Sequence, residues 1–173
     1  HIARQVAHAY HRATPAFVRS GVSHFMLNAS YPTVIINDFL QAKLRDGLSD
    51  LGRFMLNSTL GLAGLLDPAT DAGLEIHDED FGQTLGKWGL HSGPYVVLPI
   101  LGPATVRDTV GLAADELTDP RHYIKDSTVK WSVMVLHRLE ERERLIAVES
   151  MLDRAADKYV FVRSAYLQSR AYR

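Results

Sequence analysis

The sequence contains no cysteine, which excludes disulfide bonds, thiol nucleophiles and thiolate metal sites. It also lacks an excess of charge of either sign, because 19 lysine and arginine residues stand against 20 aspartate and glutamate residues. Without a basic field, no surface is expected to hold the backbone of a nucleic acid. The 173 residues suffice for one domain with a core, and we expect a single domain over residues 1–173.

The common catalytic and nucleotide-binding motifs are missing as well. No GxSxG elbow follows a strand, and the sequence has no HExxH, Walker loop or GxGxxG after a strand. The stretch around Ser23 resembles an elbow only superficially, because it lies within an amphipathic helical pattern. His8 and His11 share a helix face, and residues 77–80 (HDED) offer further ligand types, but incidental surface residues explain both better. We therefore expect no enzyme activity, no cofactor and no metal site.

Helical periodicity dominates and strand-like alternation is scarce, which predicts an all-α fold. A first helix is expected to stop before Thr14-Pro15, and Thr14 is the expected N-cap of the second. The Tyr31-Pro32 pair is expected to break that second helix. The apolar run over residues 34–40 then forms a short buried or interfacial helix, because it is too short to span a bilayer.

A narrow polar stripe marks the helix expected over residues 44–62. Asp46, Asp50, Arg53 and Asn57 fall on one side of this otherwise apolar helix. The stripe is either an ordinary solvated face or the wall of a hydrophilic channel. The channel is favoured if the protein lies in one leaflet, since polar side chains there need a wet surface. Arg53 would then meet a lipid phosphate, and an internal ion pair with Asp50 is the other explanation.

Residues 88–106 carry no formal charge over 19 positions, which at first suggests a transmembrane helix. Pro94, Pro99 and Pro103 contradict that interpretation, because each proline inside a helix costs about 3 kcal/mol. We expect an apolar, irregular segment instead. Irregular backbone cannot face hydrocarbon, so the segment must be covered by protein or line a wet cavity.

The remaining chain is predicted to be loop and helix. The expected segments are an acidic, exposed loop over 71–80, a helix from about 106 to 119, a long helix from a cap at Ser127 or Thr128 to about Asp157, and a terminal helix over 158–170. At about 1.5 Å per residue the long helix would measure roughly 45 Å. Residues 159–162 alone would also fit a strand.

Two long stretches of the sequence resemble those of a known family. DLGRFMLNSTLGLAGLLDPA at 50–69 and DFGQTLGKWGLHSGPYVVLPILGPATVRD at 80–108 are similar to the signature segments of MlaA/VacJ lipoproteins. The flanking segments TPAFVRSGVSHFMLN at 14–28, YPTVIINDFLQAK at 31–43 and KYVFVRSAYLQSR at 158–170 match in the same order. The resemblance covers nearly the whole chain.

The resemblance implies a ring-like assembly of amphipathic helices with a Pro/Gly-rich irregular segment, lying in the inner leaflet of the bacterial outer membrane on its periplasmic side. The ring would enclose an amphipathic passage that removes phospholipid from the outer leaflet and so maintains lipid asymmetry. Implied partners are a trimeric outer-membrane porin and a soluble, MlaC-like periplasmic phospholipid carrier. A signal peptide, a lipid-modified cysteine and the first mature residues are expected before residue 1.

Two sets of candidate site residues follow. The lipid-channel candidates are Asp46, Asp50, Arg53, Asn57, Asp80, Gln83, Arg107 and Asp108, where Arg107 has an ion pair with Asp108 as its other explanation. The candidates for the membrane interface and gating are Phe17, Phe25, Met26, Pro94, Tyr95 and Pro99. Two alternative functions stay open: a lipid-modifying hydrolase that uses Ser23 or His91, and a purely structural porin-associated lipoprotein.

Overall fold

Most of the chain is helical, as the periodicity predicts. The structure is a computed structural model that describes residues 2–99 and 101–171. Its elements in chain order are α1 (Ile2–Ala13), α2 (Ala16–Leu40), α3 (Leu44–Thr59), α4 (Pro68–Asp71), α5 (Phe81–Lys87), β1 (Tyr95–Leu98), β2 (Gly102–Thr105), α6 (Val106–Thr118), the 3-10 helix η1 (Pro120–Tyr123), α7 (Ser127–Arg144), α8 (Ile146–Arg154) and α9 (Lys158–Ala171).

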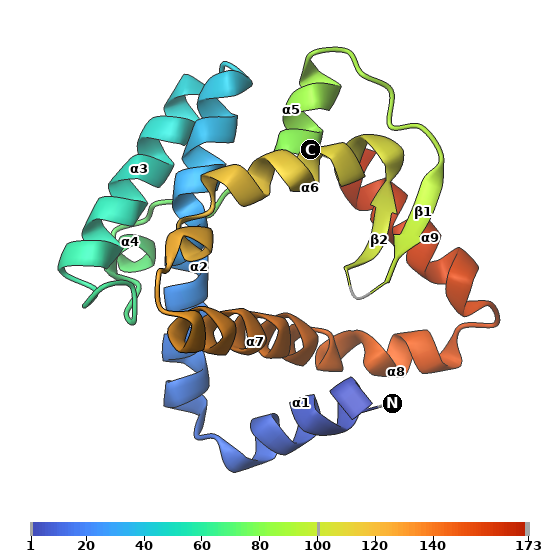
Figure 1. The fold of residues 1–173 in the computed structure, drawn as a ribbon, viewed down its shortest axis with the longest axis horizontal. Helices are drawn as coiled ribbons and strands as arrows, with labels where there is room; N and C mark the ends of the chain where they lie inside the picture. Colours follow the sequence, from blue (N-terminus) through green and yellow to red (C-terminus); the bar gives the residue numbers. More distant parts are fainter. Residues whose placement is uncertain (1, 100, 172–173) are drawn as a thin grey trace.

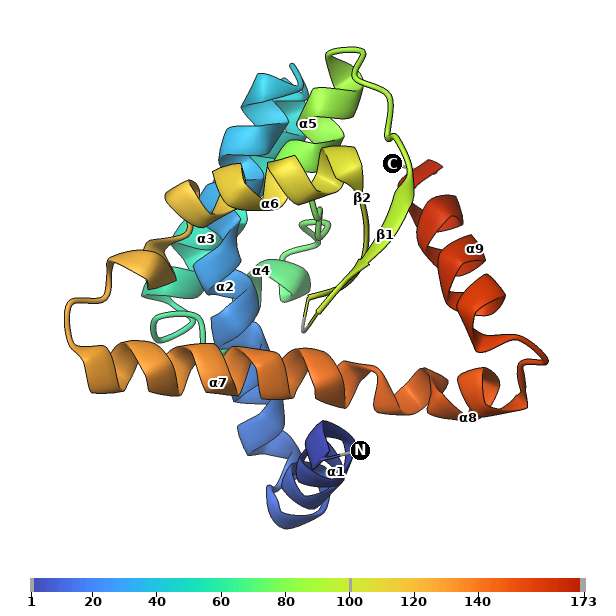
Figure 2. The same cartoon turned by 45° about the vertical axis from the view of Figure 1, so that its right-hand side comes forward.

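The elements form an open ring, as the resemblance implies (Figure 1). Helices α2 and α3 pack together on one flank, and α6 runs along the edge where α5 also lies. Helices α7 and α8 run along the opposite edge, and α9 with the β1–β2 hairpin completes the remaining flank. Helix α1 packs against α7 on the outer side of the ring (Figure 2).

The prediction that Tyr31-Pro32 breaks the second helix is wrong. Helix α2 continues through Pro32 to Leu40, although a proline inside a helix costs about 3 kcal/mol. Burial on both sides of the proline offsets that cost: Tyr31 is 0% exposed, and Val34 shortly after it is also buried. Residues 34–40 are therefore the end of a long helix and not a separate short one.

Two predicted helix caps are also wrong. Helix α2 begins after Pro15 without a side-chain cap, so Thr14 does not have that role. Helix α7 is capped by Asp126, whose carboxylate accepts a hydrogen bond from the backbone N–H of Val129 at 2.9 Å. An aspartate one residue earlier thus replaces the expected Ser127 or Thr128.

Two helices are shorter than the periodicity suggests. Helix α3 ends at Thr59, because Leu62 and Ala63 have φ angles of 54° and 60°, which lie outside the right-handed helical region. The long helix expected up to Asp157 is divided at Leu145 into α7 and α8. The helices expected after Pro103 and over 158–170 are confirmed as α6 and α9, which rules out the strand over 159–162.

The segment over 88–106 contains an antiparallel hairpin that the sequence did not predict. Val97 pairs with Pro103 and Leu98 pairs with Gly102. A proline is tolerated there because a strand of a two-stranded sheet has one free edge, and Gly102 has a φ of 89°, which favours glycine. Within residues 2–99 and 101–171, no helix is both long enough and apolar enough to cross a membrane.

Candidate functional site

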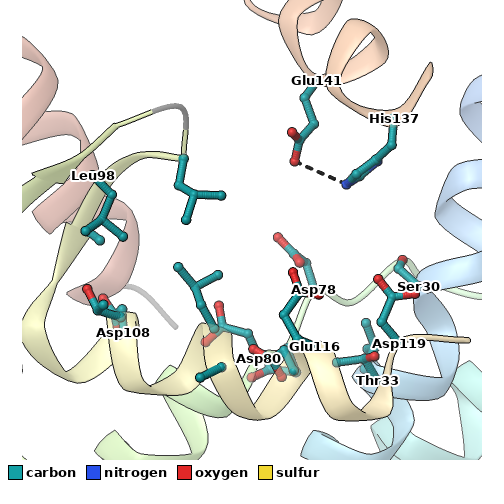
Figure 3. A pocket seen from close by; sticks show the side chains of 18 of the residues that line it. Ser30, Thr33, Asp78, Asp80, Leu98, Asp108, Glu116, Asp119, His137 and Glu141 are labelled. Atoms are coloured by element: carbon teal, nitrogen blue, oxygen red, sulfur yellow. Dashed lines mark ion pairs between the residues drawn. The ribbon is translucent and has the colours of Figure 1, made fainter. Parts of the chain in front are cut away.

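A cavity of about 560 Å³ lies between opposite sides of the ring (Figure 3). Residues of α2, α6, α7, α9, the hairpin and the loop before α5 line it. The apolar part of the lining consists of Val34, Leu98, Leu101, Pro103, Ala104, Leu112, Ala113 and Met134. The charged part consists of Asp78, Glu79, Asp80, Asp108, Asp115, Glu116, Asp119, Arg121, Arg138, Glu141 and Arg170. The cavity is therefore amphipathic.

One face of α6 forms a wall of the cavity. Asp108, Leu112 and Asp115 lie three or four positions apart, so a helix places them on one side. Asp115 accepts hydrogen bonds from the side chain of Asn37 at 3.0 Å and from a backbone N–H. Burial nevertheless raises the pKa of Asp115 to about 6. The spacing of these residues is a sequence signal for the whole face, although only Asp108 was predicted as a site residue.

Helix α7 forms the facing wall through Met134, His137, Arg138 and Glu141. Arg138 donates a hydrogen bond to Glu141 at 2.8 Å, and the imidazole of His137 lies 3.4 Å from the same carboxylate (Figure 3). Burial first, and then the charge of Arg121, lower the pKa of His137. The imidazole is therefore neutral at neutral pH.

Helix α9 is connected to the cavity wall by an ion-pair cluster. The hydroxyl of Tyr166 donates to Asp108 at 2.6 Å, and Arg170 lies 3.5 Å from the same carboxylate. Arg170 also donates to Asp80, which caps α5 by accepting a hydrogen bond from the N–H of Gln83. Burial alone would lower the pKa of Arg170, but the charges of Asp80 and Asp108 and the hydrogen bonds with Tyr166 and Asp80 together outweigh burial and raise the pKa. The cluster joins three elements around one end of the cavity.

With the ring and its cavity described, comparison with known proteins gives a consistent result. The family model described as "MlaA lipoprotein" matches residues 1–173. The chain belongs to this family.

Several members of the MlaA family are similar over most of their length. The intermembrane phospholipid transport system lipoproteins MlaA of Shigella flexneri and Escherichia coli (strain K12) are each 36% identical, over 97% of this chain and 68% of the relative. A solved structure described as "Structural basis for maintenance of bacterial outer membrane lipid asymmetry" superposes with a TM-score of 0.86 at 34% identity, over 99% of this chain and 87% of the other. The family resemblance and the mainly helical fold expected from the sequence are thereby confirmed.

The structure separates the channel candidates of this MlaA family member into two groups. Asp80 and Asp108 line the cavity. Gln83 is buried beside it and donates to the backbone carbonyl of Asp78, while Arg107 contacts Asp108 at 3.1 Å, the ion pair that the sequence left open.

The polar stripe of α3 lies elsewhere. Asp50, Arg53 and Asn57 are buried between α2, α3 and α4 and are absent from the cavity lining. Arg53 pairs with Asp67 at 2.8 Å, not with Asp50 as the alternative explanation had it. Asp46 is 40% exposed at the side-chain level and is outside the lining too. Asp50, Arg53 and Asn57 are part of the packed interior because α2 and the chain after α3 cover them.

The membrane-interface candidates of α2 occupy different surroundings. Phe17 is 79% exposed, whereas Met26 is buried in the core, and Phe25 is intermediate between them in exposure. Of the three, Phe17 therefore presents the largest apolar surface to the surroundings of the protein.

The other three interface candidates belong to the hairpin. Pro94 and Pro99 are exposed at the two ends of β1. Tyr95 packs edge-on against Tyr159 and Tyr166 of α9. These ring contacts tie the hairpin to that helix, so Tyr95 holds the ring together at this flank.

A buried carboxyl pair lies where α2 meets α3. Asp38 and Asp50 are both 0% exposed. Nδ1 of His77 lies 3.1 Å from each oxygen of Asp50, whereas neither oxygen of Asp38 has a hydrogen-bond partner among the described residues. Burial, followed by the neighbouring Asp50 carboxylate, raises the pKa of Asp38 to about 7. Burial would lower the pKa of His77, but the hydrogen bond to Asp50 and the charges of Asp50, Asp46 and Asp38 together outweigh burial and raise it.

This pair makes stability depend on pH. The Asp38 carboxyl has an ordinary pKa of 3.8 and a folded-state pKa of about 7, so the folded state holds the extra proton between these values. The contribution of the protonated Asp38 carboxyl to stability is fully present below pH 3.8 and is lost as the pH rises to about 7. We expect Asp38→Asn, which keeps the shape without the charge, to stabilise the protein by about 1 to 3 kcal/mol at pH 8 and very little at pH 4.

Urea unfolding at the two pH values measures this difference. Asp153→Asn is the matched control, because Asp153 lies on an exposed part of α8 and is expected to change stability by less than about 0.5 kcal/mol at either pH. A gain of equal size at pH 4 and pH 8 for Asp38→Asn would contradict the assignment of the buried proton.

Proposed function

We propose that this chain is the outer-membrane component of an intermembrane phospholipid transport system. It removes phospholipid from the outer leaflet through the cavity of the ring and so maintains the lipid asymmetry of the membrane. The observation that carries the proposal is the amphipathic lining of the cavity, in a fold shared with relatives that bear this name. A phospholipid has an apolar and a charged part, and the cavity offers a surface for each.

The residues favour transport over the alternative of a lipid-modifying hydrolase. The hydroxyl of Ser23 donates to the carboxylate of Glu140 at 2.7 Å, and neither residue lines the cavity. His91 is exposed and does not line the cavity. We therefore propose no covalent step.

The outer surface of the ring supports a position in the plane of one leaflet. Large apolar side chains project from α3 and the loop after it, although no described helix can cross a membrane. These exposed residues are Leu44, Leu48, Leu51, Met55, Leu60, Leu62, Leu65 and Leu66. Apolar helices that lie in a membrane plane bury such faces below the headgroups. We propose that this face lies in the inner leaflet of the outer membrane, with the rest of the protein on the periplasmic side.

The proposed location implies two kinds of protein partner. A trimeric porin would contact the ring within the membrane, and a soluble periplasmic carrier would receive the lipid. Site-directed photocrosslinking in cells tests both: we expect probes on α3 to capture porin, and we expect separate positions to capture the carrier. Capture of porin from every position and of carrier from none would favour the purely structural lipoprotein.

Filling the cavity tests the transport proposal directly. Ala113 is a small residue of the apolar lining, so Ala113→Trp introduces a ring into the lipid path. We expect the full-length variant to lose most of its co-purified phospholipid, measured by native mass spectrometry after mild detergent extraction. We also expect phospholipid in the outer leaflet of cells that carry the variant to rise to the level of a deletion strain.

The matched control is Ala72→Trp, which adds the same bulk at an exposed position outside the cavity lining. It is expected to behave like the wild type in both measurements. A correctly folded Ala113→Trp variant that retains normal lipid content and normal outer-leaflet composition would refute a lipid path through this cavity.

A further inference from the structure

Helix α9 is attached to the ring differently from α2. Over its whole length, Lys158–Ala171, α9 has no buried residue, whereas α2 buries Met26, Tyr31 and Val34. Tyr159 and Val160 of α9 are more than half exposed. An element with few buried apolar contacts separates from its neighbours at a low cost in free energy. Burial therefore does little to hold α9 in place.

A short link joins α9 to the preceding helix. Helix α8 ends at Arg154, and Ala155 has an extended backbone with a φ of −65° and a ψ of 132°. Residues 155–157 thus connect two helices without continuing either of them. The ion pair between Lys158 and Asp153 spans the link, but its side chains are 60% and 46% exposed, so it contributes little. Such a link can absorb the backbone rotation of a hinge.

The far end of α9 is held by polar contacts to α5 and α6, beside which it lies (Figure 1). The hydroxyl of Tyr166 donates to Asp108 of α6 at 2.6 Å. Arg170 donates to Asp80, the cap of α5, and lies 3.5 Å from Asp108. We call these four side chains the latch. Tyr166 and Arg170 are also the residues through which α9 lines the cavity, so the latch and the α9 wall of the cavity coincide.

We propose that α9 is a gate of the cavity, which turns about residues 155–157 when the latch separates and thereby opens this flank of the ring to a phospholipid. The inference rests on the proposed function and names the element that moves. Hydrogen bonds and ion pairs suit a latch because water replaces them when they separate, so their net strength is modest. In the closed arrangement Asp108 is only 2% exposed. When the gate opens, Tyr166 and Arg170 leave the lining and the cavity loses its α9 wall.

Spin-label distances in the full-length protein, reconstituted in lipid nanodiscs, measure the opening of the gate. Because these 173 residues contain no cysteine, labels can be placed at Ser169→Cys on α9 and Ser132→Cys on α7, which are exposed positions outside the cavity lining. We expect Arg170→Gln to raise the ratio of the longer-distance to the shorter-distance population about tenfold, because the charge-assisted contacts of the latch are lost. We expect bound phospholipid to exchange for deuterated phosphatidylethanolamine faster by a similar factor, measured by native mass spectrometry.

Arg163→Gln is the matched control, because it removes an exposed guanidinium group of the same helix that does not line the cavity. It is expected to change neither measurement. A second label pair, Arg45→Cys on α3 and Ser132→Cys on α7, reports whether the rest of the ring keeps its shape, and its distance is expected to stay the same in Arg170→Gln. An unchanged distance between α9 and α7 in Arg170→Gln, or equal changes in both label pairs, would overturn the gate.

Locking the gate tests the inference from the opposite side. Asp80→Cys/Arg170→Cys replaces the ion pair with two thiols, which a short reducible crosslinker joins. We expect the locked protein to keep its bound phospholipid but to exchange it about tenfold more slowly than after reduction with dithiothreitol. Equal exchange rates before and after reduction would overturn the gate while leaving phospholipid transport intact. A wild type without any bound phospholipid would refute the transport proposal, whereas the label distances would still show whether α9 moves.

Discussion

Replacing Arg53 with alanine is expected to lower the free energy of unfolding by about 3 to 5 kcal/mol, because the change leaves a largely buried carboxylate without its partner. Arg53 is 0% exposed, and one of its nitrogens donates to both oxygens of Asp67, at 2.8 and 2.9 Å. The same nitrogen also reaches the hydroxyl of Thr70, and the other donors reach the hydroxyl of Tyr31 at 2.6 Å and the carbonyl of Leu74. One side chain thus connects α2, α3 and the segment around α4.

The charge of Asp67 predicts how this loss varies with pH. Burial would raise the pKa of Asp67, but hydrogen bonds from Thr70 and Asn57 and the charge of Arg53 outweigh burial and lower it below 3.8. A lowered folded-state pKa contributes stability above the unfolded value, and that contribution is lost as the pH falls through the folded value. The difference in the free energy of unfolding between the wild type and Arg53→Ala is therefore expected to have its full size at pH 7. It is expected to shrink as the pH falls below 3.8.

Urea unfolding of matched variants measures the effect. Arg45→Ala removes an exposed arginine from the same helix and is expected to change stability by less than about 0.5 kcal/mol. The double variant Arg53→Leu/Asp67→Leu is expected to be more stable than Arg53→Ala, because no unpaired charge remains. A loss below about 1 kcal/mol for Arg53→Ala would show that the buried pair does not support the fold.

Local sequence patterns predicted the helices better than their contacts. The periodicity over 106–119 and 158–170 corresponds to α6 and α9, and the polar stripe at Asp50, Arg53 and Asn57 does share one helix face. Periodicity shows that a face is polar, but not what covers it. The partner of Arg53 is Asp67, which follows a turn with positive φ angles at Leu62, Ala63 and Gly64.

The cavity was harder to predict because distant segments build it. Residues before α5, along α6 and along α7 are brought together only when the ring closes, so Arg121 and His137 gave no local signal. The predicted helix break at Pro32 was wrong for a related reason, because burial of the neighbouring Tyr31 outweighs the local helix-breaking preference of proline. Asp80 and Asp108, two of the channel candidates, line the cavity, and both form ion pairs with Arg170 of α9.

A second large loss of stability is expected where α5 crosses α6 at Gly111. A Cβ atom on Gly111 would lie 2.3 Å from the backbone nitrogen of Gly82 and 2.7 Å from its Cα. These are backbone atoms of the facing helix, so no side chain can turn away to make room. We expect Gly111→Ala to destabilise the protein by about 3 kcal/mol or more, even though alanine favours the helix by about 1 kcal/mol.

Gly52→Ala is the matched control because Gly52 is also helical, but its added Cβ would meet only the Leu74 side chain at 3.8 Å. It is expected to stabilise the protein by about 0.5 to 1 kcal/mol, so the two glycine variants should shift the thermal midpoint in opposite directions. Because α6 carries Asp108 and Asp115 into the cavity wall, Gly111→Ala should also reduce the lipid retained by the full-length protein at temperatures where it is still folded. Equal midpoints for the two variants would mean that α5 and α6 can separate without cost, and the ring would then not hold its cavity through this contact.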